Sequence, residues 1–287
     1  MVPMRTDMHQ HLLPEELIAA LARRTASPRL VRDGRGWRLE LAGEPASAFE
    51  PADHDPDARA AAADVERIVV SLSAALGIEA LPGDEAEPLL RAFNGGILEL
   101  GGPFALWGAA TDPAALDALL DAGALGLSLP AGSLDRAAPL LDRLEARGAP
   151  LFVHPGPVAS ARDRPEWWPA LTDYVAAMSA AWHAFAAWGR ARHPRLRVVF
   201  AMLAGCGPLH AERLALRGGP AEAIHDPLVW FDTSSYGPCA VDAMLRMVGV
   251  DRLVRGTDLP VVAPPAHRFG DGVEHALAVD NPAAVLA

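Results

Sequence analysis

The sequence predicts an α/β protein that folds as a (β/α)8 barrel, the TIM barrel. A chain of 287 residues suits one such barrel with small insertions, because the fold typically needs about 250 residues. Eight short apolar runs alternate with longer helical patterns, which is the signature of a parallel sheet. Several runs are apolar on both faces, as expected for strands between outer helices and a packed interior. We therefore expect one domain over residues 1–287.

The eight candidate strands share a short length, an apolar composition and flanking turn residues. They are Met4–His9, Arg67–Ser73, Phe104–Ala110, Ala124–Leu129, Leu151–His154, Arg197–Met202, Leu228–Thr233 and Leu253–Thr257. Helices are predicted between them from their end signals. Asp112 is placed to cap a helix that Pro113 begins, and Gly148 is placed to end another. The expected helices are Pro14–Arg24, Pro113–Ala122, Asp135–Arg147, Leu171–His193 and Val241–Val248.

Two segments interrupt this alternation. Residues 25–64 contain a glycine-rich turn followed by alternating apolar and polar residues from Trp37 to Leu41, which predicts a β-hairpin or small flap. Residues 155–169 form a long loop after the fifth strand and carry Trp167 and Trp168. We expect both segments to lie near the barrel mouth, where loops follow the strands.

Composition and charge exclude several classes of protein. Hydrophobic residues make up 51% of the chain, which excludes a wholly disordered protein. The net charge of −11 argues against a nucleic-acid partner that binds a broad basic surface. No apolar run approaches the roughly 20 residues of a membrane span, the first residues lack a signal-peptide core, and two cysteines make no disulfide scaffold. We expect a soluble, cytoplasmic protein without a membrane partner.

Histidine and aspartate side chains follow three of the predicted strands. His9 and His11 lie two residues apart at the end of the first strand, so strand alternation places them on one side. His154 ends the fifth strand, and Asp258 follows the last. Barrel active sites form at these strand ends. Three imidazoles and one carboxylate are a suitable ligand set for one catalytic divalent ion.

The same segments resemble the amidohydrolase superfamily, in its amidohydrolase-related branch, which includes aminocarboxymuconate-semialdehyde decarboxylase-like enzymes. The matching pieces are residues 7–11 (DMHQH), 153–156 (VHPG), 256–260 (GTDLP) and 281–286 (NPAAVL). The resemblance spans nearly the whole chain and is weakest over residues 25–64. It implies a distorted (β/α)8 barrel of the metal-dependent hydrolase type, and a homodimer. It also implies one divalent ion, usually zinc, held by His9, His11, His154 and Asp258.

One position departs from the family pattern. The family places a histidine at the end of the sixth strand as an acid and base, and Met202 stands there in this sequence. A thioether cannot exchange a proton. Either Asp258 serves as both ligand and base, or His210 replaces the missing imidazole, or the barrel binds a ligand without turning it over.

The resemblance implies a reaction class but not one reaction. The leading hypothesis is a metal-dependent hydrolase that acts on a small cyclic or carboxylated substrate through activated water, with Asp258 as catalytic residue. The alternative is a metal-dependent decarboxylase of a small aromatic or unsaturated acid. The second alternative is a catalytically silent barrel that binds a small molecule.

Contacts to a small-molecule substrate are expected mainly from the loop after the fifth strand. Arg162 and Arg164 lie there beside Trp167, and an arginine beside an aromatic ring suits a planar carboxylate. His210 is a further candidate, from the segment after the sixth strand.

Overall fold

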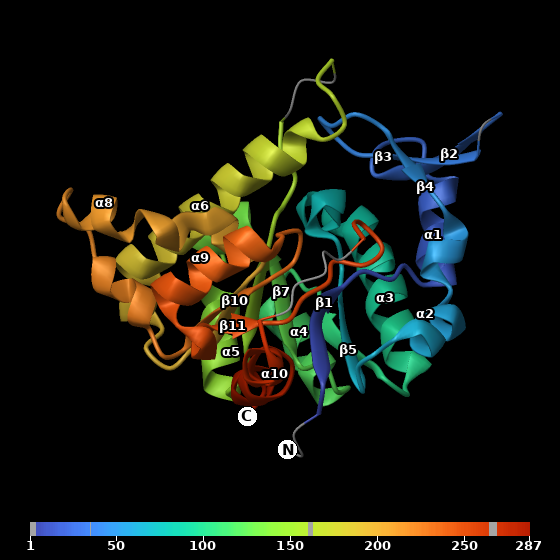
Figure 1. Cartoon of the computed structure of the whole chain (residues 1–287). Coiled ribbons are helices and arrows are strands. Elements are labelled where there is room, and N and C mark those ends of the chain that lie inside the picture. Colours follow the sequence, from blue (N-terminus) through green and yellow to red (C-terminus); the bar gives the residue numbers. More distant parts are fainter. Residues whose placement is uncertain (1–3, 35, 160–162, 264–268) are drawn as a thin grey trace.

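The structure is a computed structural model that describes residues 4–34, 36–159, 163–263 and 269–287. Eight parallel strands form a nearly closed barrel, and helices pack around its outside (Figure 1). The carboxyl ends of the strands all face the same end of the barrel, which is the upper end in Figure 1. The predicted (β/α)8 architecture is therefore confirmed.

Strands and helices alternate along most of the chain. The strands are β1 (Thr6–Gln10), β2 (Arg29–Asp33), β3 (Gly36–Glu40), β4 (Ser47–Phe49), β5 (Arg67–Ser71), β6 (Phe104–Gly108), β7 (Gly126–Pro130), β8 (Leu151–His154), β9 (Val198–Phe200), β10 (Val229–Asp232) and β11 (Leu253–Val254). The α-helices are α1 (Glu15–Arg23), α2 (Pro56–Ala62), α3 (Gly83–Leu100), α4 (Pro113–Asp121), α5 (Ala138–Arg147), α6 (Tyr174–Ala184), α7 (Arg190–Arg192), α8 (Ala211–Ala215), α9 (Pro238–Val248), α10 (Asp271–His275) and α11 (Asn281–Val285).

The barrel strands follow the order β1-β5-β6-β7-β8-β9-β10-β11. Strands that are neighbours in the barrel therefore also follow one another along the chain, apart from β2, β3 and β4, which form a separate sheet. The seam between β1 and β11 closes differently from the other junctions. It is made by one isolated bridge, Gln10 with Leu259, and by single backbone hydrogen bonds such as His11 N–H to the Leu259 carbonyl at 2.7 Å. Among the described residues, no ladder of paired strands joins the two ends of the sheet there.

Each of the eight predicted strands is present, with ends that differ by a few residues. The capping predictions also hold. The Asp112 carboxylate accepts hydrogen bonds from the backbone N–H groups of Ala114 and Ala115, and Gly148 ends α5 with a left-handed φ of 61°. Sequence reasoning missed α3, whose interior contains Pro88 and two glycines. Those residues lower local helix propensity, and α3 forms because it packs its apolar face against α1 and β6.

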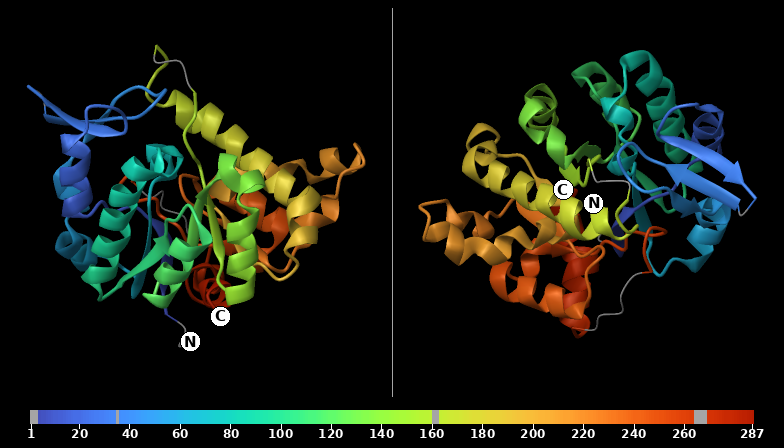
Figure 2. Two further views of the ribbon diagram at one scale, coloured as in Figure 1. Left: turned by 180° about the vertical axis from the view of Figure 1, so that it is seen from behind. Right: turned by 90° about the horizontal axis from the view of Figure 1, so that it is seen from above.

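Residues 25–64 form a small antiparallel sheet, β2-β3-β4, followed by α2. This sheet, called the flap below, stands at the upper end of the barrel, across from α6 (Figures 1 and 2). Two polar contacts join the flap to α6 and to the loop that precedes it. The Tyr174 hydroxyl lies 2.8 Å from both carboxylate oxygens of Glu44, and Arg38 lies 3.8 Å from Glu166. The flap thus bridges from α1 to the start of α6.

None of the helices in the described part of the chain is long and apolar enough to cross a membrane. The buried apolar residues instead form two clusters inside the domain. One lies within and around β6 to β11, and the other joins β5 and β6 to α1 and α3. This packing fixes the positions of the carboxyl ends of the barrel strands, which carry polar side chains.

A buried carboxyl group generates a prediction about stability. Both oxygens of Glu79 are buried without a hydrogen-bond partner among the described residues, and burial raises the pKa of this carboxyl from 4.5 to about 7. Between these two values the folded chain holds a proton that the unfolded chain releases, so the free energy of unfolding falls as pH rises through this window.

We therefore expect Glu79→Gln to stabilise the protein above pH 7, by up to about 3 kcal/mol, and to have little effect near pH 4. Urea unfolding of both proteins at several pH values measures the difference. Parallel pH profiles for the two proteins would contradict the expected role of Glu79.

Candidate metal centre

Four polar side chains from distant parts of the sequence meet at the upper end of the barrel. One ligand atom from each lies within 4.8 Å of those of the others, and all four residues are buried. The four are His9, His11, His154 and Asp258. The structure thus brings together the residues that the sequence analysis grouped as metal ligands.

The local backbone explains how each side chain reaches this point. His9 lies in β1 and His11 directly after it, so the two rings project from the same strand end. His154 is the last residue of β8. Asp258 follows β11 and has a left-handed backbone with φ 64°, which is strained for a residue other than glycine. Its backbone N–H donates to the His9 carbonyl at 2.9 Å, which holds the last strand end beside the first.

The three imidazoles point the same ring nitrogen at one another. His11 Nε2 lies 3.1 Å from His9 Nε2 and 3.2 Å from His154 Nε2. The rings meet edge to face, with centroids 4.9 to 5.0 Å apart. Asp258 Oδ1 completes the group at 3.3 Å from His11 Nε2 and 3.6 Å from His9 Nε2.

The other nitrogen of each ring faces a hydrogen-bond acceptor. His9 Nδ1 lies 2.7 Å from Asp232 Oδ2, His11 Nδ1 lies 2.9 Å from the Ser71 carbonyl, and His154 Nδ1 lies 2.8 Å from the Pro155 carbonyl. These acceptors place the ring proton on Nδ1 in all three cases. Each Nε2 therefore presents a lone pair to the shared point.

This arrangement fits a divalent cation. A tetrahedral ion with ligand bonds of about 2.0 Å separates its donor atoms by about 3.3 Å, and the distances between these nitrogens are close to that value. Three converging lone pairs and a carboxylate repel one another unless positive charge lies between them. Imidazole nitrogen and carboxylate oxygen suit zinc, manganese and similar ions.

Burial and charge shift the pKa values within the cluster in opposite directions. Burial lowers the pKa of the His154 imidazole, and the neighbouring His11 and His9 lower it further. Burial also disfavours charge on His9, but the Asp232 carboxylate outweighs it and raises the His9 pKa. Burial alone would raise the pKa of the Asp258 carboxyl, but contacts with His11 and His9 hold it well below its ordinary value.

Asp232 is the residue that sequence reasoning missed. It is the last residue of β10, is fully buried, and holds the Nδ1–H of His9 through Oδ2. Its Oδ1 accepts hydrogen bonds from the backbone N–H groups of Met202 and Ser234. An aspartate near the end of the predicted strand 228–233 was the signal in the sequence, but its contact with His9 depends on the barrel bringing β10 beside β1.

Asp258 also has a partner outside the cluster. The Ser235 hydroxyl donates to Asp258 Oδ2 at 2.6 Å. Because Ser235 satisfies Oδ2, the carboxylate is oriented with Oδ1 toward the imidazoles. Ser235 has a left-handed backbone with φ 63°, as Asp258 has. Two strained residues therefore face each other across the site.

Met202 follows β9, where the family pattern has a histidine. Its side chain is buried with the apolar cluster of β6 to β11, and its backbone N–H donates to Asp232 Oδ1 at 2.9 Å. Residues 202–206 all have a left-handed backbone, with φ between 50° and 59°. The position thus contributes an amide to the network around His9 and contributes no imidazole.

The expected substrate contacts lie outside the four-residue cluster. Trp167 is exposed and packs at a tilt on Trp168, and the Arg164 guanidinium lies 4.9 Å from the Trp168 ring centroid. All three belong to the loop before α6 that approaches the flap. Arg162 lies outside the described residues.

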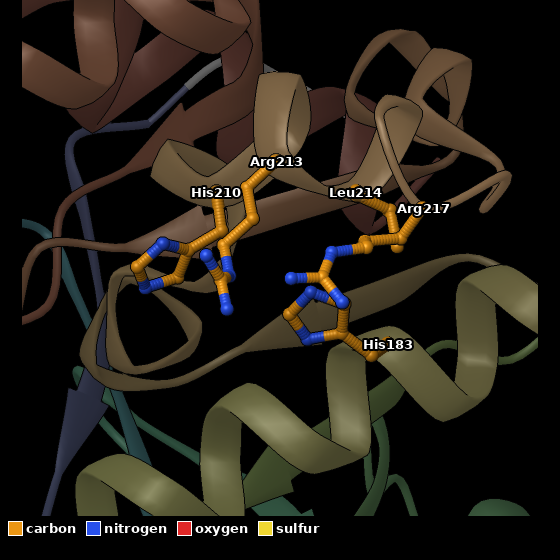
Figure 3. Close-up of a pocket in the computed structure, with 5 residues that line it drawn as sticks. All are labelled: His183, His210, Arg213, Leu214 and Arg217. Atoms are coloured by element: carbon orange, nitrogen blue, oxygen red, sulfur yellow. The ribbon is translucent and has the colours of Figure 1, made fainter.

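His210 lies at the end of the segment after β9 and lines a different pocket. The side chains around that pocket are His183, His210, Arg213, Leu214 and Arg217, which Figure 3 shows. None of the four cluster residues lines this pocket. The structure therefore does not bring His210 to the place of the missing imidazole.

Comparison with solved structures shows the same fold over the whole chain. The apo form of IDCase from Metarhizium anisopliae superposes with a TM-score of 0.77 at 20% identity, covering 99% of this chain and 97% of that one. The 5-carboxyvanillate decarboxylase LigW from Sphingomonas paucimobilis gives 0.74 at 17% identity, with 98% of each chain covered.

A third structure holds a metal. The dihydroxybenzoic acid decarboxylase from Polaromonas sp. JS666, with bound manganese and the inhibitor 2-nitroresorcinol, gives a TM-score of 0.68 at 13% identity, covering 98% of this chain and 96% of that one. No protein-family profile and no curated protein sequence matches the chain. The neighbours confirm the barrel fold that the resemblance implied.

The contact between Asp232 and His9 generates a prediction about metal affinity. A carboxylate behind a ligating histidine fixes the ring and strengthens the ligand, and its loss typically costs about 10- to 100-fold in affinity. We expect Asp232→Asn to weaken zinc binding by about that factor, as measured by competition with a chelating dye. Asp84→Asn, a change at an exposed carboxylate of α3, is the control. Equal affinity for both variants would contradict the role of Asp232.

Proposed function

We propose that this protein is a metal-dependent decarboxylase of a small aromatic or unsaturated carboxylic acid. The observation that carries the proposal is the buried cluster of three Nε2 atoms and one carboxylate at the barrel mouth. Solved structures that share the fold over its whole length include several decarboxylases. They favour decarboxylation over the hydrolysis that was the leading hypothesis from sequence.

The proposed cofactor is one divalent ion, with His9, His11, His154 and Asp258 as its ligands. Nitrogen and oxygen donors in this number suit zinc, the ion expected from the resemblance. They also suit manganese, which the Polaromonas decarboxylase holds. When bound, such an ion acts as a Lewis acid that stabilises negative charge on a substrate carboxylate or phenolate.

The residues of the chain have separate tasks in this proposal. Asp232 keeps His9 in the tautomer that exposes Nε2, and Ser235 keeps Asp258 turned toward the imidazoles. The cluster residues are at most 6% exposed, so they lie in a region from which bulk water is largely excluded. A low dielectric strengthens every interaction between the site and substrate charge.

Proton transfer is assigned to Asp258. The carboxylate is ionised at neutral pH, and an ionised carboxylate can accept a proton and return it to the substrate carbon. Within the cluster it is the only group other than the imidazoles that titrates. It would therefore take over the acid and base work that the family assigns to the histidine replaced by Met202.

Met202 also supports a second candidate, hydrolysis. Decarboxylation needs a proton delivered to carbon, and the imidazole expected for that step is replaced by a thioether. Hydrolysis needs only activated water and one carboxylate base, both of which the cluster can provide when a metal is bound. A silent binding barrel is the third hypothesis, and the same assays separate all three.

Substrate contacts are proposed on the loop that follows His154. Arg164 and Trp167 would meet the carboxylate and the ring of a planar acid, and Arg162 stays a prediction from the sequence. The expected partner is thus a small molecule, and the expected assembly is a homodimer, which light scattering would test.

The proposed function is tested with protein that has been stripped of metal and reloaded with zinc or manganese. Hydroxybenzoates and unsaturated dicarboxylates are offered as substrates, with release of CO2 and loss of ultraviolet absorbance as readouts. We expect turnover that requires the metal and, in D2O, a product with deuterium on the carbon that had carried the carboxyl group. Turnover of lactones or amides alone would establish hydrolysis instead.

The role of Asp258 gives a further prediction. Asp258→Asn keeps an oxygen ligand but removes the base, so we expect decarboxylation to fall by about 100-fold or more while metal remains bound. Metal content is measured on the same sample. If the native protein is inactive on every substrate and Met202→His creates activity, the silent barrel is the correct hypothesis.

A further inference from the structure

An arginine from the insertion reaches the seam between the first and last barrel strands. Arg59 lies in α2, is half-buried, and points its guanidinium at the end of β1. Its Nη1 lies 2.8 Å from Gln10 Oε1, 3.3 Å from the His11 carbonyl and 3.4 Å from the Leu259 carbonyl. Its Nη2 donates to the Asp53 carbonyl at 2.5 Å.

Two of these acceptors belong to the segments that carry the candidate ligands. The His11 carbonyl is in a ligand residue itself, and the Leu259 carbonyl is in the residue directly after Asp258. His11 N–H also donates to the Leu259 carbonyl, so one carbonyl oxygen receives hydrogen bonds from both His11 and Arg59. Arg59 thus contacts both sides of the seam, at a ligand residue on one side and next to a ligand residue on the other.

The seam is held together differently from the other junctions of the barrel. Neighbouring strands elsewhere pair in registers of two to four residues. The first strand and the last segment share one isolated bridge and four backbone hydrogen bonds, donated by Met8, His11, Thr257 and Asp258. The separation between His11 and Asp258 is set across this junction. A small opening of the seam would move the carboxylate away from the imidazoles.

A series of side-chain hydrogen bonds also connects Arg59 to the residue before Asp258. Gln10, held by Arg59 through its amide oxygen, donates its amide N–H to Asp7 Oδ2 at 2.7 Å. The Thr257 hydroxyl donates to the same oxygen at 2.6 Å. Thr257 directly precedes Asp258, so Arg59 is connected to both flanks of that ligand.

We propose that Arg59 is a positioning residue for the metal centre, which sets the distance between the His11 side and the Asp258 side of the ligand set. This inference rests on the proposed metal role of the cluster. It assigns the insertion of residues 25–64 a part in the site, although none of the candidate ligands comes from it. Arginine suits the task because its fixed fork of donors bridges several carbonyls at once.

The test uses cobalt(II) as the probe, because its visible spectrum reports ligand geometry as well as occupancy. For Arg59→Ala we expect cobalt binding about 10- to 100-fold weaker than in the native protein, with a changed absorption spectrum. Arg59→Lys, which keeps a cation but loses the fork, should give an intermediate affinity. If Arg59→Ala does not fold, the lysine variant is judged by the same criteria.

Arg24→Ala is the matched control. Arg24 is likewise not exposed, with 13% side-chain exposure, and it donates to the Pro28 carbonyl and to Glu85, neither of which belongs to or contacts the cluster. We expect it to lower the melting temperature while binding cobalt as the native protein does.

Three results would overturn the inference in distinguishable ways. Native affinity and spectrum in Arg59→Ala would show that the seam holds without Arg59. Equal losses of affinity in the Arg59 and Arg24 variants would show a general effect of stability. Failure of the native protein itself to bind cobalt, zinc or manganese would remove the proposed metal role, and the positioning role with it.

Discussion

The barrel and its polar centre depend on the end of the chain meeting its beginning. The closed sheet forms only when the segment after β11 lies against β1, and this junction has one bridge and a few single hydrogen bonds. Buried polar side chains supplement it, since Asp7 accepts hydrogen bonds from Thr257, Gln10 and the backbone of His9. Closure places His9, His11 and Asp258 around one point, so the site and the barrel are completed by the same contacts.

Burying so much polarity is costly unless each group has a partner. The network around His9 meets this requirement residue by residue. Asp232 uses one carboxylate oxygen for the His9 ring and the other for the amides of Met202 and Ser234. The imidazole nitrogens that face the centre are the groups left over, and converging lone pairs are what a cation satisfies. The polar arrangement therefore has one coherent physical explanation.

Backbone strain is concentrated around the same point. Residues 202–206, Ser235 and Asp258 all adopt left-handed conformations, each of which costs of order 1 kcal/mol for a residue other than glycine. The segment 202–206 packs against α6, where a side chain at Gly205 would lie 2.3 Å from the Val175 carbonyl. Tight packing of this kind holds the strained backbone in place. It also delivers the Met202 amide to Asp232.

Local patterns in the amino-acid sequence were enough to predict the eight strands, the helices α1, α4, α5, α6 and α9, and the group of three histidines and one aspartate. Those patterns are apolar runs, capping residues such as Asp112, and polar residues at strand ends. Packing in three dimensions was needed to establish that α3 is a helix despite Pro88, that Asp232 lies behind His9, and that His210 lies in another pocket. Arg59 likewise reaches its partners across the fold. Such contacts depend on how strands and helices pack, and residue spacing carries no information about which distant side chains then meet.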